Sequence, residues 1–216
     1  MRKQLVIFDL DGTLLDTLDD LTDAVNWALA QEGMPLRTRE EVRAFVGNGI
    51  RNLIERAVPV GADPARTDRV FDGFKEHYAE HCADKTCPYP GVLQLLVRLR
   101  AQGIRIAVVS NKADFAVQAL CRDYFPDLVD CVVGERAGIP KKPAPDSVNE
   151  VLRTLDMARE RAIYIGDSEV DVATARNARM DGIFVLWGFR GKQALEQAGA
   201  KSFAATAQEL CAMLIG

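Results

Sequence analysis

The sequence has no surplus of positive charge, no long hydrophobic run and no closely paired cysteines. Its 27 Lys and Arg residues are fewer than its 31 Asp and Glu residues, and the net charge of −4 argues against a broad attraction to nucleic acid or to an anionic membrane. The first apolar run ends at Asp9, which makes it too short for a signal peptide or a membrane span. The five cysteines form no C-x-x-C pair, which favours reduced thiols. We therefore expect a cytoplasmic globular protein that binds neither nucleic acid nor membrane.

Short apolar runs alternate with helical patterns along most of the chain. The runs cover residues 5–8 and then end at Ser110, Gly134, Asp167 and Trp187. They are continuous rather than alternating, as expected of strands that are covered on both faces of a parallel sheet. Between two of them, the segment 92–103 repeats its apolar residues at helical spacing and ends in a glycine. These units predict an α/β fold with a doubly wound, Rossmann-like parallel sheet.

One long segment interrupts this alternation. From about residue 16 to about residue 83 the chain has helical patterns and no convincing strand. We therefore expect an α/β core domain made of residues 1–15 and 84–216. A small helical cap domain, residues 16–83, would be inserted after the first strand.

Two sequence pairs inside the inserted segment predict helix starts. Thr17 with Asp20, and Thr38 with Glu41, both have the spacing of a capping box. In that motif the hydroxyl and the acidic side chain each accept a backbone hydrogen bond from the first turn. A helix is therefore expected after each threonine.

Polar residues stand at or near the ends of several predicted strands. These residues are Asp9, Asp11, Ser110, Lys142 and Asp167. In a doubly wound sheet, ligands bind at the carboxyl ends of the strands, so these side chains are expected to converge. A divalent cation such as Mg²⁺ and a lysine suited to phosphate would relieve the mutual repulsion of the carboxylates. One aspartate could then attack phosphorus while the other transfers protons. The alternative interpretation of Asp9 to Gly12, taken alone, is a strand followed by a helix-capping turn.

Four stretches, in this order, resemble the motifs of the haloacid dehalogenase-like superfamily. They read "DLDGTLLDT", "VVSNK", "KKPAPD" and "GDSEVD", and the resemblance covers essentially the whole chain. The inserted helical segment resembles the small cap of that superfamily. "FVGNGIRNLIERAV" and "VLWGFRG" resemble the bacterial phosphoglycolate phosphatase group.

The resemblance implies roles for the polar strand ends. Asp9 matches the nucleophile that becomes an aspartyl-phosphate, and Asp11 matches the general acid and base. The Mg²⁺ ligands would be Asp9, the carbonyl of Asp11, and Asp167. Ser110 matches the hydroxyl that holds a phosphoryl oxygen, and Lys142 matches the lysine that neutralises nucleophile and phosphate. An aspartate at position 11 also disfavours dehalogenase activity, since the dehalogenases of the superfamily lack it.

Four further residues lie at or near the same motifs. Asp171 would support the metal site or pair with Lys142. Thr13 is expected to contact the substrate. Asn111 and Lys112 continue the Ser110 loop, and they either contact substrate or remain solvated.

The loop Gly47, Asn48, Gly49 precedes a predicted helix, so its backbone amides could hold an anion there. Arg51, in the first helical turn, could bind a substrate carboxylate. The alternative is a helix–helix turn with a solvated arginine, which local sequence alone favours. The resemblance favours a substrate contact, because the corresponding cap loop faces the catalytic crevice.

Two histidines and two cysteines lie near the end of the inserted segment. They are His77, His81, Cys82 and Cys87. Zinc binding is one interpretation, and an exposed helix end is the other. The second is favoured because no second paired set of ligands follows.

The sequence as a whole predicts a Mg²⁺-dependent phosphatase of a small phosphorylated metabolite, with 2-phosphoglycolate as the first substrate to test. The alternatives on the same scaffold are a pyrophosphatase and a sugar-phosphate phosphatase or mutase. A further alternative is a non-catalytic phosphometabolite-binding protein. Nothing in the sequence indicates the oligomeric state.

Overall fold

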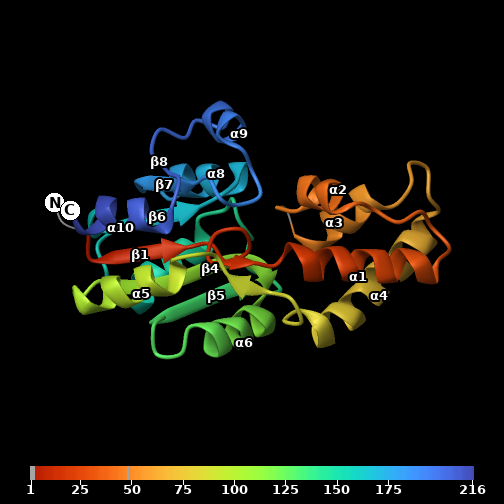
Figure 1. Cartoon of the computed structure of the whole chain (residues 1–216), viewed down its shortest axis with the longest axis horizontal. Coiled ribbons are helices and arrows are strands. Elements are labelled where there is room, and N and C mark those ends of the chain that lie inside the picture. The colour runs from red at the N-terminus through yellow and green to blue at the C-terminus, as the bar shows by residue number, and fades with distance from the viewer. Residues whose placement is uncertain (1–2, 48) are drawn as a thin grey trace. The chain divides into compact units, whose positions relative to one another are not determined.

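The structure is a computed structural model that describes residues 3–47 and 49–216. The chain divides into two compact units. One combines Met1–Leu15 with Pro88–Gly216, and the other is Asp16–Cys87 (Figure 1). We refer to them as the core unit and the cap unit.

The chain passes between the units twice, at β2 (Leu15–Asp16) and at β3 (Cys87–Pro88). These two short strands pair with each other in a two-stranded ribbon. The second passage lies at Cys87, whereas the sequence analysis placed the domain boundary after residue 83.

The core unit contains a six-stranded sheet in the order β5-β4-β1-β6-β7-β8. All of its neighbouring strands run parallel. The strands are β1 (Leu5–Phe8), β4 (Arg105–Ala113), β5 (Cys131–Glu135), β6 (Ala162–Gly166), β7 (Gly182–Val185) and β8 (Phe203–Ala204). This confirms the doubly wound α/β fold. The two-residue strand β8 was not predicted, because two residues show no periodicity.

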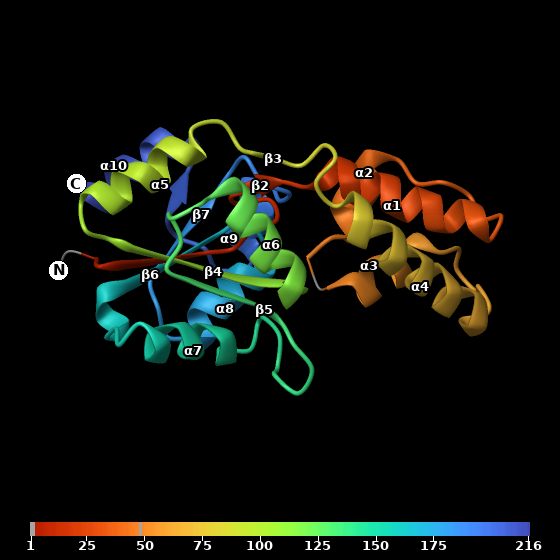
Figure 2. The same ribbon diagram turned by 90° about the horizontal axis from the view of Figure 1, so that it is seen from below.

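Helices cover both faces of the core sheet (Figure 2). Residues of α5, α6 and α10 belong to one buried apolar cluster, and residues of α7, α8 and α9 to the other. These helices are α5 (Val92–Ala101), α6 (Asp114–Tyr124), α7 (Asp146–Thr154), α8 (Glu169–Asn177), α9 (Lys192–Gln197) and α10 (Ala207–Ile215). A 3₁₀ turn, η1 (Arg159–Arg161), precedes β6.

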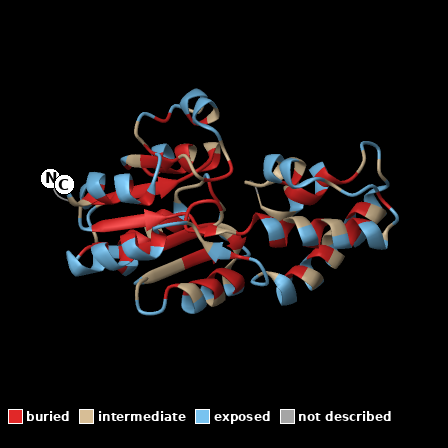
Figure 3. Cartoon of the chain, viewed as in Figure 1, coloured by how far each residue is buried: buried red, intermediate tan, exposed pale blue. Residues whose placement is uncertain are grey.

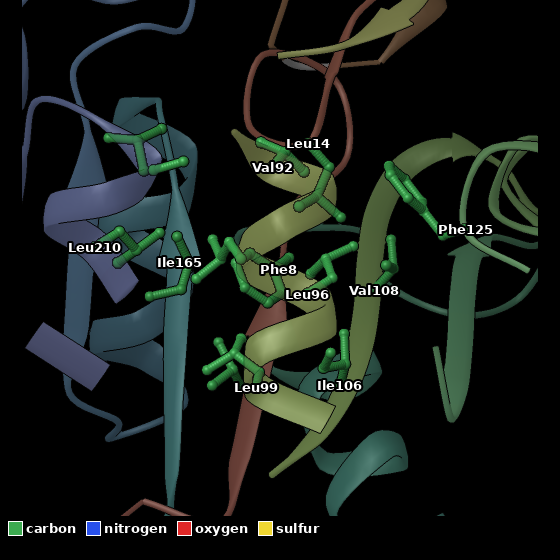
Figure 4. Packing of buried hydrophobic residues seen from close by; sticks show 14 of the residues in the cluster. Phe8, Leu14, Val92, Leu96, Leu99, Ile106, Val108, Phe125, Ile165 and Leu210 are labelled. Atoms are coloured by element: carbon green, nitrogen blue, oxygen red, sulfur yellow. The ribbon is translucent and has the colours of Figure 1, made fainter. Parts of the chain in front are cut away.

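Strand β1 contributes to both clusters because its side chains alternate between the faces. Val6 and Phe8 pack in one cluster, and Leu5 and Ile7 in the other. All four are fully buried, as Figure 3 shows for the whole strand. Figure 4 shows Phe8 against Leu96 of α5. Removing a ring of this kind by substitution with alanine costs about 3–5 kcal/mol, so β1 is held firmly up to the residue before Asp9.

The cap unit is helical in the part of the chain that the structure describes. Its helices are α1 (Leu18–Gln31), α2 (Arg39–Phe45), α3 (Ile50–Ala57) and α4 (Pro64–His81). The longest two, α1 and α4, pack against each other. Their buried faces include Val25 and Leu29 from α1, and Val70 and Phe74 from α4. Within residues 3–47 and 49–216, no helix has both the length and the apolar character that crossing a membrane requires.

One of the two predicted capping boxes forms. Thr38 and Glu41 exchange both hydrogen bonds at the start of α2, as predicted. The box predicted at Thr17 and Asp20 is wrong, since the Thr17 side chain makes no capping hydrogen bond. Asp20 instead accepts hydrogen bonds from the backbone of Lys85 and Thr86, at 2.9 Å and 2.8 Å. A distant part of the chain thus supplies the donors that the local pattern assigned to the helix start.

Candidate active site

Neighbouring strands of the core sheet bring the predicted polar residues to one edge. Strand β1 lies between β4 and β6, so Asp9 after β1, Ser110 in β4 and Asp167 after β6 lie at adjacent strand ends. Lys142 comes from the segment between β5 and α7. Parallel strands end at a common edge, and this geometry places residues that are far apart in sequence side by side.

Lys142 is the centre of the group. Its Nζ lies 2.8 Å from Oδ1 of Asp9 and 2.8 Å from Oδ1 of Asp171, and its side chain is only 3% exposed. It also donates to the hydroxyl of Tyr164, at 3.2 Å. Burial acts to lower the pKa of Lys142, but the carboxylates of Asp171 and Asp9 outweigh burial and hold it well above its usual range. The lysine is therefore a fixed positive charge beside Asp9.

Asp171 uses both carboxylate oxygens inside the protein. Oδ1 accepts from Lys142 and, at 2.9 Å, from the Tyr164 hydroxyl. Oδ2 accepts from Oγ of Ser168 at 2.6 Å, from the Ser168 amide and from the Asp167 amide. Burial acts to raise the pKa of Asp171, but the charge of Lys142 and these hydrogen bonds outweigh it and hold the pKa below its usual range. Asp171 thus supports the site as a carboxylate that is already saturated with donors.

Asp167 is held in one orientation by two neighbouring segments. Its Oδ1 accepts from Oγ1 of Thr13 at 3.0 Å, and its Oδ2 accepts from the amide of Phe189 at 2.7 Å. A Cβ on Gly12, whose φ is +84°, would lie 2.5 Å from Oδ2 of Asp167. A Cβ on Gly188 would lie 2.4 Å from the Cβ of Asp167. Both glycines are therefore required for the backbone to approach this carboxylate so closely.

Asp11 faces a different lysine. Nζ of Lys112 lies 3.0 Å and 3.3 Å from the two carboxylate oxygens of Asp11. The Lys112 side chain is 4% exposed and that of Asp11 is 18% exposed.

Cys121 is a buried thiol close to this pair. Burial, with a smaller contribution from the charge of Asp11, raises the pKa of Cys121 to about 12. The thiol therefore stays protonated and unreactive.

The end of β4 connects these groups. The Nδ2 of Asn111 donates to the carbonyl of Lys142 at 3.0 Å, and the buried Oγ of Ser110 accepts from the amide of Lys112 at 3.2 Å. Asn111 and Lys112 are thus engaged inside the core unit. The solvated interpretation of this loop is therefore wrong.

Asp9, the candidate nucleophile, and Asp167 both have raised pKa values, chiefly because they are buried. Burial raises the pKa of Asp9 well above its usual range, and the charge of Asp171 adds to this while Lys142 opposes it. Burial, with the charge of Asp171, raises the pKa of Asp167 to about 7. The pKa of Asp9 is thus raised in spite of its contact with Lys142, whereas the additional hydrogen bonds to Asp171 help to keep the pKa of Asp171 low.

Carboxylate oxygens of Asp9, Asp167 and Asp171 lie within 4.8 Å of one another. These oxygen donors suit a hard divalent cation. The hydrogen bonds of Asp171 leave it poorly placed to become a ligand. In Asp9, Oδ1 contacts the ammonium group of Lys142 and accepts a hydrogen bond from the Leu10 amide, which leaves Oδ2 available for other contacts. The residues therefore fit a cation held mainly by Asp9 and Asp167.

The predicted anion-binding residues of the cap unit lie on the loop before α3. Gly47 and Gly49 both have positive φ, 132° and 83°, and Gly49 is the N-cap residue of α3. Asn48 lies outside the described residues. Arg51 is already paired, with Glu55 at 2.8 Å and with Asp68 at 2.6 Å. Its guanidinium is thus not a bare positive charge in this structure.

The histidines of α4 have partners of their own. His77 stacks on Trp27 with ring centroids 4.6 Å apart, and His81 contacts Asp84 at 2.8 Å. Burial, assisted by His81, lowers the pKa of His77. These contacts account for both rings without a metal ion.

Some residues of the site were missed or left undecided by sequence analysis. Tyr164 lies inside an apolar strand run, so its contact with Lys142 and Asp171 had no local signal. The backbone of Phe189 contacts Asp167, and the indole of Trp187 donates to the carbonyl of Thr13 at 3.0 Å. The sequence analysis noted the stretch "VLWGFRG" for its resemblance to the phosphoglycolate phosphatase group, but it did not predict these contacts.

Comparison with known proteins agrees with this architecture. A model of the family described as haloacid dehalogenase-like hydrolase matches residues 6–185. A phosphoglycolate phosphatase of Psychrobacter arcticus is 35% identical over 205 residues, which cover 91% of this chain and 89% of the relative. One of Mesorhizobium japonicum is 32% identical over 200 residues, which cover 91% and 88%. A solved structure from Lactobacillus delbrueckii subsp. bulgaricus, provisionally named a phosphoglycolate phosphatase, has a TM-score of 0.95 at 39% identity, with all of both chains covered.

A doubly wound sheet with a buried carboxylate–lysine cluster at its strand ends defines an α/β enzyme site. The chain belongs to the haloacid dehalogenase-like hydrolase family. Within that family it is an enzyme of the phosphatase class, similar to the phosphoglycolate phosphatases.

Proposed function

We propose that this enzyme hydrolyses a small phosphate monoester through a covalent intermediate on Asp9. The observation that carries the proposal is the contact of Asp9 with Lys142, 2.8 Å apart and buried. A carboxylate held by a permanent cation can face an anionic phosphate, because the lysine neutralises part of the combined negative charge.

In the first step, an oxygen of Asp9 attacks phosphorus and the bond from phosphorus to the ester oxygen breaks. Oδ1 of Asp9 accepts from Lys142 and from the Leu10 amide, which leaves Oδ2 for the attack. Asp11 gives a proton to the departing ester oxygen, so the leaving group departs as an alcohol. Ser110 and Lys142 bind phosphoryl oxygens during the transfer.

In the second step, water attacks the phosphorus of the aspartyl-phosphate on Asp9. Asp11, now a carboxylate, takes a proton from that water, and the bond from phosphorus to Asp9 breaks. Phosphate leaves and both aspartates return to their starting state. The same residue serves as acid and then as base, so no other proton donor is needed.

The residues that would hold a divalent cation are Asp9, Asp167 and the carbonyl of Asp11. Mg²⁺ fits because it prefers a few carboxylate oxygens together with phosphate and water. When bound, it would supply positive charge to the phosphate oxygens. Thr13 and Phe189 fix the carboxylate of Asp167 for this purpose.

The proposed substrate is 2-phosphoglycolate. The names of the relatives support it, and so does the cap loop with Gly47 and Gly49, whose amides precede a helix. Arg51 would contact the substrate carboxylate only by giving up contacts with Glu55 and Asp68. The cap residues therefore support this substrate less strongly than the names do.

A sugar phosphate is the second candidate. CbbY from Rhodobacter sphaeroides, solved in complex with xylulose-(1,5)bisphosphate, is 25% identical to this chain with a TM-score of 0.77 and 96% of both chains covered. A sugar phosphatase or mutase on this scaffold is thus a defined alternative.

The test is phosphate release from a panel of phosphorylated metabolites with Mg²⁺, run with the wild-type enzyme and with Asp9→Asn. We expect release from 2-phosphoglycolate to exceed release from sugar phosphates and pyrophosphate, and we expect Asp9→Asn to reduce it below detection. Near-normal release by Asp9→Asn would rule out the covalent mechanism. A stronger response to a sugar phosphate, or an isomerised product with little free phosphate, would favour the second candidate.

A further inference from the structure

Lys112 is a buried lysine for which the phosphatase mechanism above has no task. Its Nζ lies 3.0 Å and 3.3 Å from the two carboxylate oxygens of Asp11, so the ammonium contacts both of them. The two residues are 101 positions apart in sequence and meet only because β4 lies beside β1. Burying an ammonium group is unfavourable unless it is paired, so this lysine is committed to its carboxylate.

Asp11 depends on this contact for its orientation. Among the residues that the structure describes, Lys112 is the hydrogen-bond donor to the Asp11 carboxylate. Asp9 is positioned differently, by Lys142 and the Leu10 amide. The two aspartates of the first motif are thus held by two different lysines, one in β4 and one in the segment between β5 and α7.

The lysine is itself fixed by its surroundings. Its side chain is 4% exposed, and its amide donates to Oγ of Ser110 at 3.2 Å. It lies near the carboxyl end of β4, between Val109 and Ala113, where the pairing of β4 with β5 is irregular. The burial of its side chain and the contact of its amide with Ser110 therefore hold it in place.

We propose that Lys112 is a positioning residue that holds the carboxyl group of Asp11 toward the leaving oxygen of the substrate. The inference rests on the proposed function, in which Asp11 protonates that oxygen as the ester bond to phosphorus breaks. Lys112 keeps its own protons throughout. It meets the negative charge that Asp11 acquires when its proton moves to the alcohol, so the contact strengthens as the step proceeds.

This role predicts a dependence on the leaving group. An alkyl alcohol leaves poorly without a proton, whereas p-nitrophenolate is a stable anion and leaves without one. Losing the position of Asp11 should therefore slow alkyl esters far more than p-nitrophenyl phosphate. The quantity to compare is kcat/KM, because it covers steps only up to the first release of product.

The experiment compares wild type with Lys112→Met on three esters, with Mg²⁺ present. They are 2-phosphoglycolate, ethyl phosphate and p-nitrophenyl phosphate. We expect kcat/KM to fall by about ten- to a hundredfold on both alkyl esters, in line with the cost of a misplaced general acid. The change on p-nitrophenyl phosphate should be less than about threefold. Lys192→Met, which removes an exposed lysine 3.6 Å from Glu196, should leave all three rates unchanged.

Three results would overturn the inference. A loss confined to 2-phosphoglycolate would make Lys112 a receptor for the substrate carboxylate instead. Equal losses on all three esters, or no loss on any, would also refute it. If the Met variant does not fold, as judged by thermal unfolding, Lys112→Gln gives the same comparison, because its amide tolerates burial and lacks the charge.

A second measurement tests whether Lys112 acts through Asp11. In an Asp11→Asn background, Lys112→Met should cause no further loss with ethyl phosphate, since the group that it positions is already gone. An undiminished loss there would contradict the proposal. Failure of the proposed function would appear in the wild-type enzyme, as no phosphate release from any ester, and would overturn both conclusions together.

Discussion

A buried ion pair of the core unit and an exposed ion pair of the cap unit have the same geometry and very different surroundings. In the core unit, Lys142 and Asp171 pair with side-chain exposures of 3% and 0%. In the cap unit, Lys75 and Asp72 pair at the same distance, 2.8 Å, but with exposures of 48% and 64%. The two ion pairs have the same distance but differ in how strongly solvent weakens them. Water screens the cap pair, while the core pair has only its protein partners.

The difference in burial also indicates which ion pairs have a chemical function. A buried pair contributes little net stability compared with apolar packing, so its presence in the core unit indicates a chemical task. Exposed pairs on the surface of helices are common in any helical domain and indicate no task by themselves. On this view, function should be sensitive to single charges in the core unit and tolerant of most changes in the cap unit.

The largest expected effect is removal of the cation. EDTA should reduce phosphate release below detection, and Mg²⁺ should restore it, because the carboxylates of Asp9 and Asp167 would otherwise repel the phosphate. Ca²⁺ should inhibit, since its larger and looser coordination misplaces the reacting groups. Full activity in metal-free buffer would show that the core carboxylates need no cation, and the proposed ligand set would be abandoned.

The next largest effect compares one lysine from each unit. Lys142→Met leaves Asp9 and Asp171 buried without their cation and should lower the free energy of unfolding by about 3–5 kcal/mol. Lys75→Met in the cap unit should change it by less than about 0.5 kcal/mol. Chemical denaturation at pH 7 measures both. Similar values for the two variants would mean that burial does not separate the units energetically.

The third effect is a pH dependence of stability without metal. Burial raises the pKa of Asp167 to about 7 in the folded protein, above the usual 3.8. A raised carboxyl pKa adds stability that is complete below 3.8 and is lost as the pH rises through about 7. The Tm in EDTA should therefore fall as the pH rises from about 4 to about 7, by an amount equivalent to a few kcal/mol.

Two comparisons test this assignment. Mg²⁺ should flatten the slope, because a bound cation stabilises the ionised carboxylates. Asp167→Asn should flatten it without Mg²⁺. A slope that persists in this variant would place its origin elsewhere, for example in Asp9.

The smallest expected effect lies in the cap unit. Arg51→Ala should lower kcat/KM for 2-phosphoglycolate by about tenfold, the size of one charge-assisted contact, and should leave p-nitrophenyl phosphate nearly unchanged. The expected loss is modest because Arg51 already has Glu55 and Asp68 as partners. No loss on either substrate would make it a surface arginine like others of the cap. Equal losses on both would assign it to stability.

Much of the core unit could be predicted from local patterns. The continuous apolar runs predicted all the longer strands, and the helical spacing in 92–103 predicted α5, since Val92, Leu95, Leu96 and Leu99 are all buried. These patterns succeed because burial on both faces requires apolar residues at every position of a strand, whatever the rest of the chain does. The Thr38–Glu41 box succeeded for a related reason, since all of its partners lie within one helical turn.

Patterns failed where the partner comes from far along the chain. Asp20 has the spacing of a capping residue, yet it accepts from the backbone of Lys85 and Thr86. Tyr164 reads as one more apolar strand residue, yet its hydroxyl contacts Lys142 and Asp171. A local sequence pattern does not predict which residue from a distant part of the chain will form a hydrogen bond with a given side chain.

The sequence by itself determined the parallel sheet, the strand ends that carry the chemistry and the identity of the residues there, because those features depend on side-chain type and spacing. Only the tertiary structure decided the partners of these residues. Asp9 and Asp11 stand two positions apart, but one is paired with Lys142 and the other with Lys112. That division follows from the order β5-β4-β1, which brings Lys112 of β4 and Lys142, from the segment after β5, to the first motif. An ion pair between residues 101 positions apart is a property of the strand order, and the strand order is set by how the whole sheet packs.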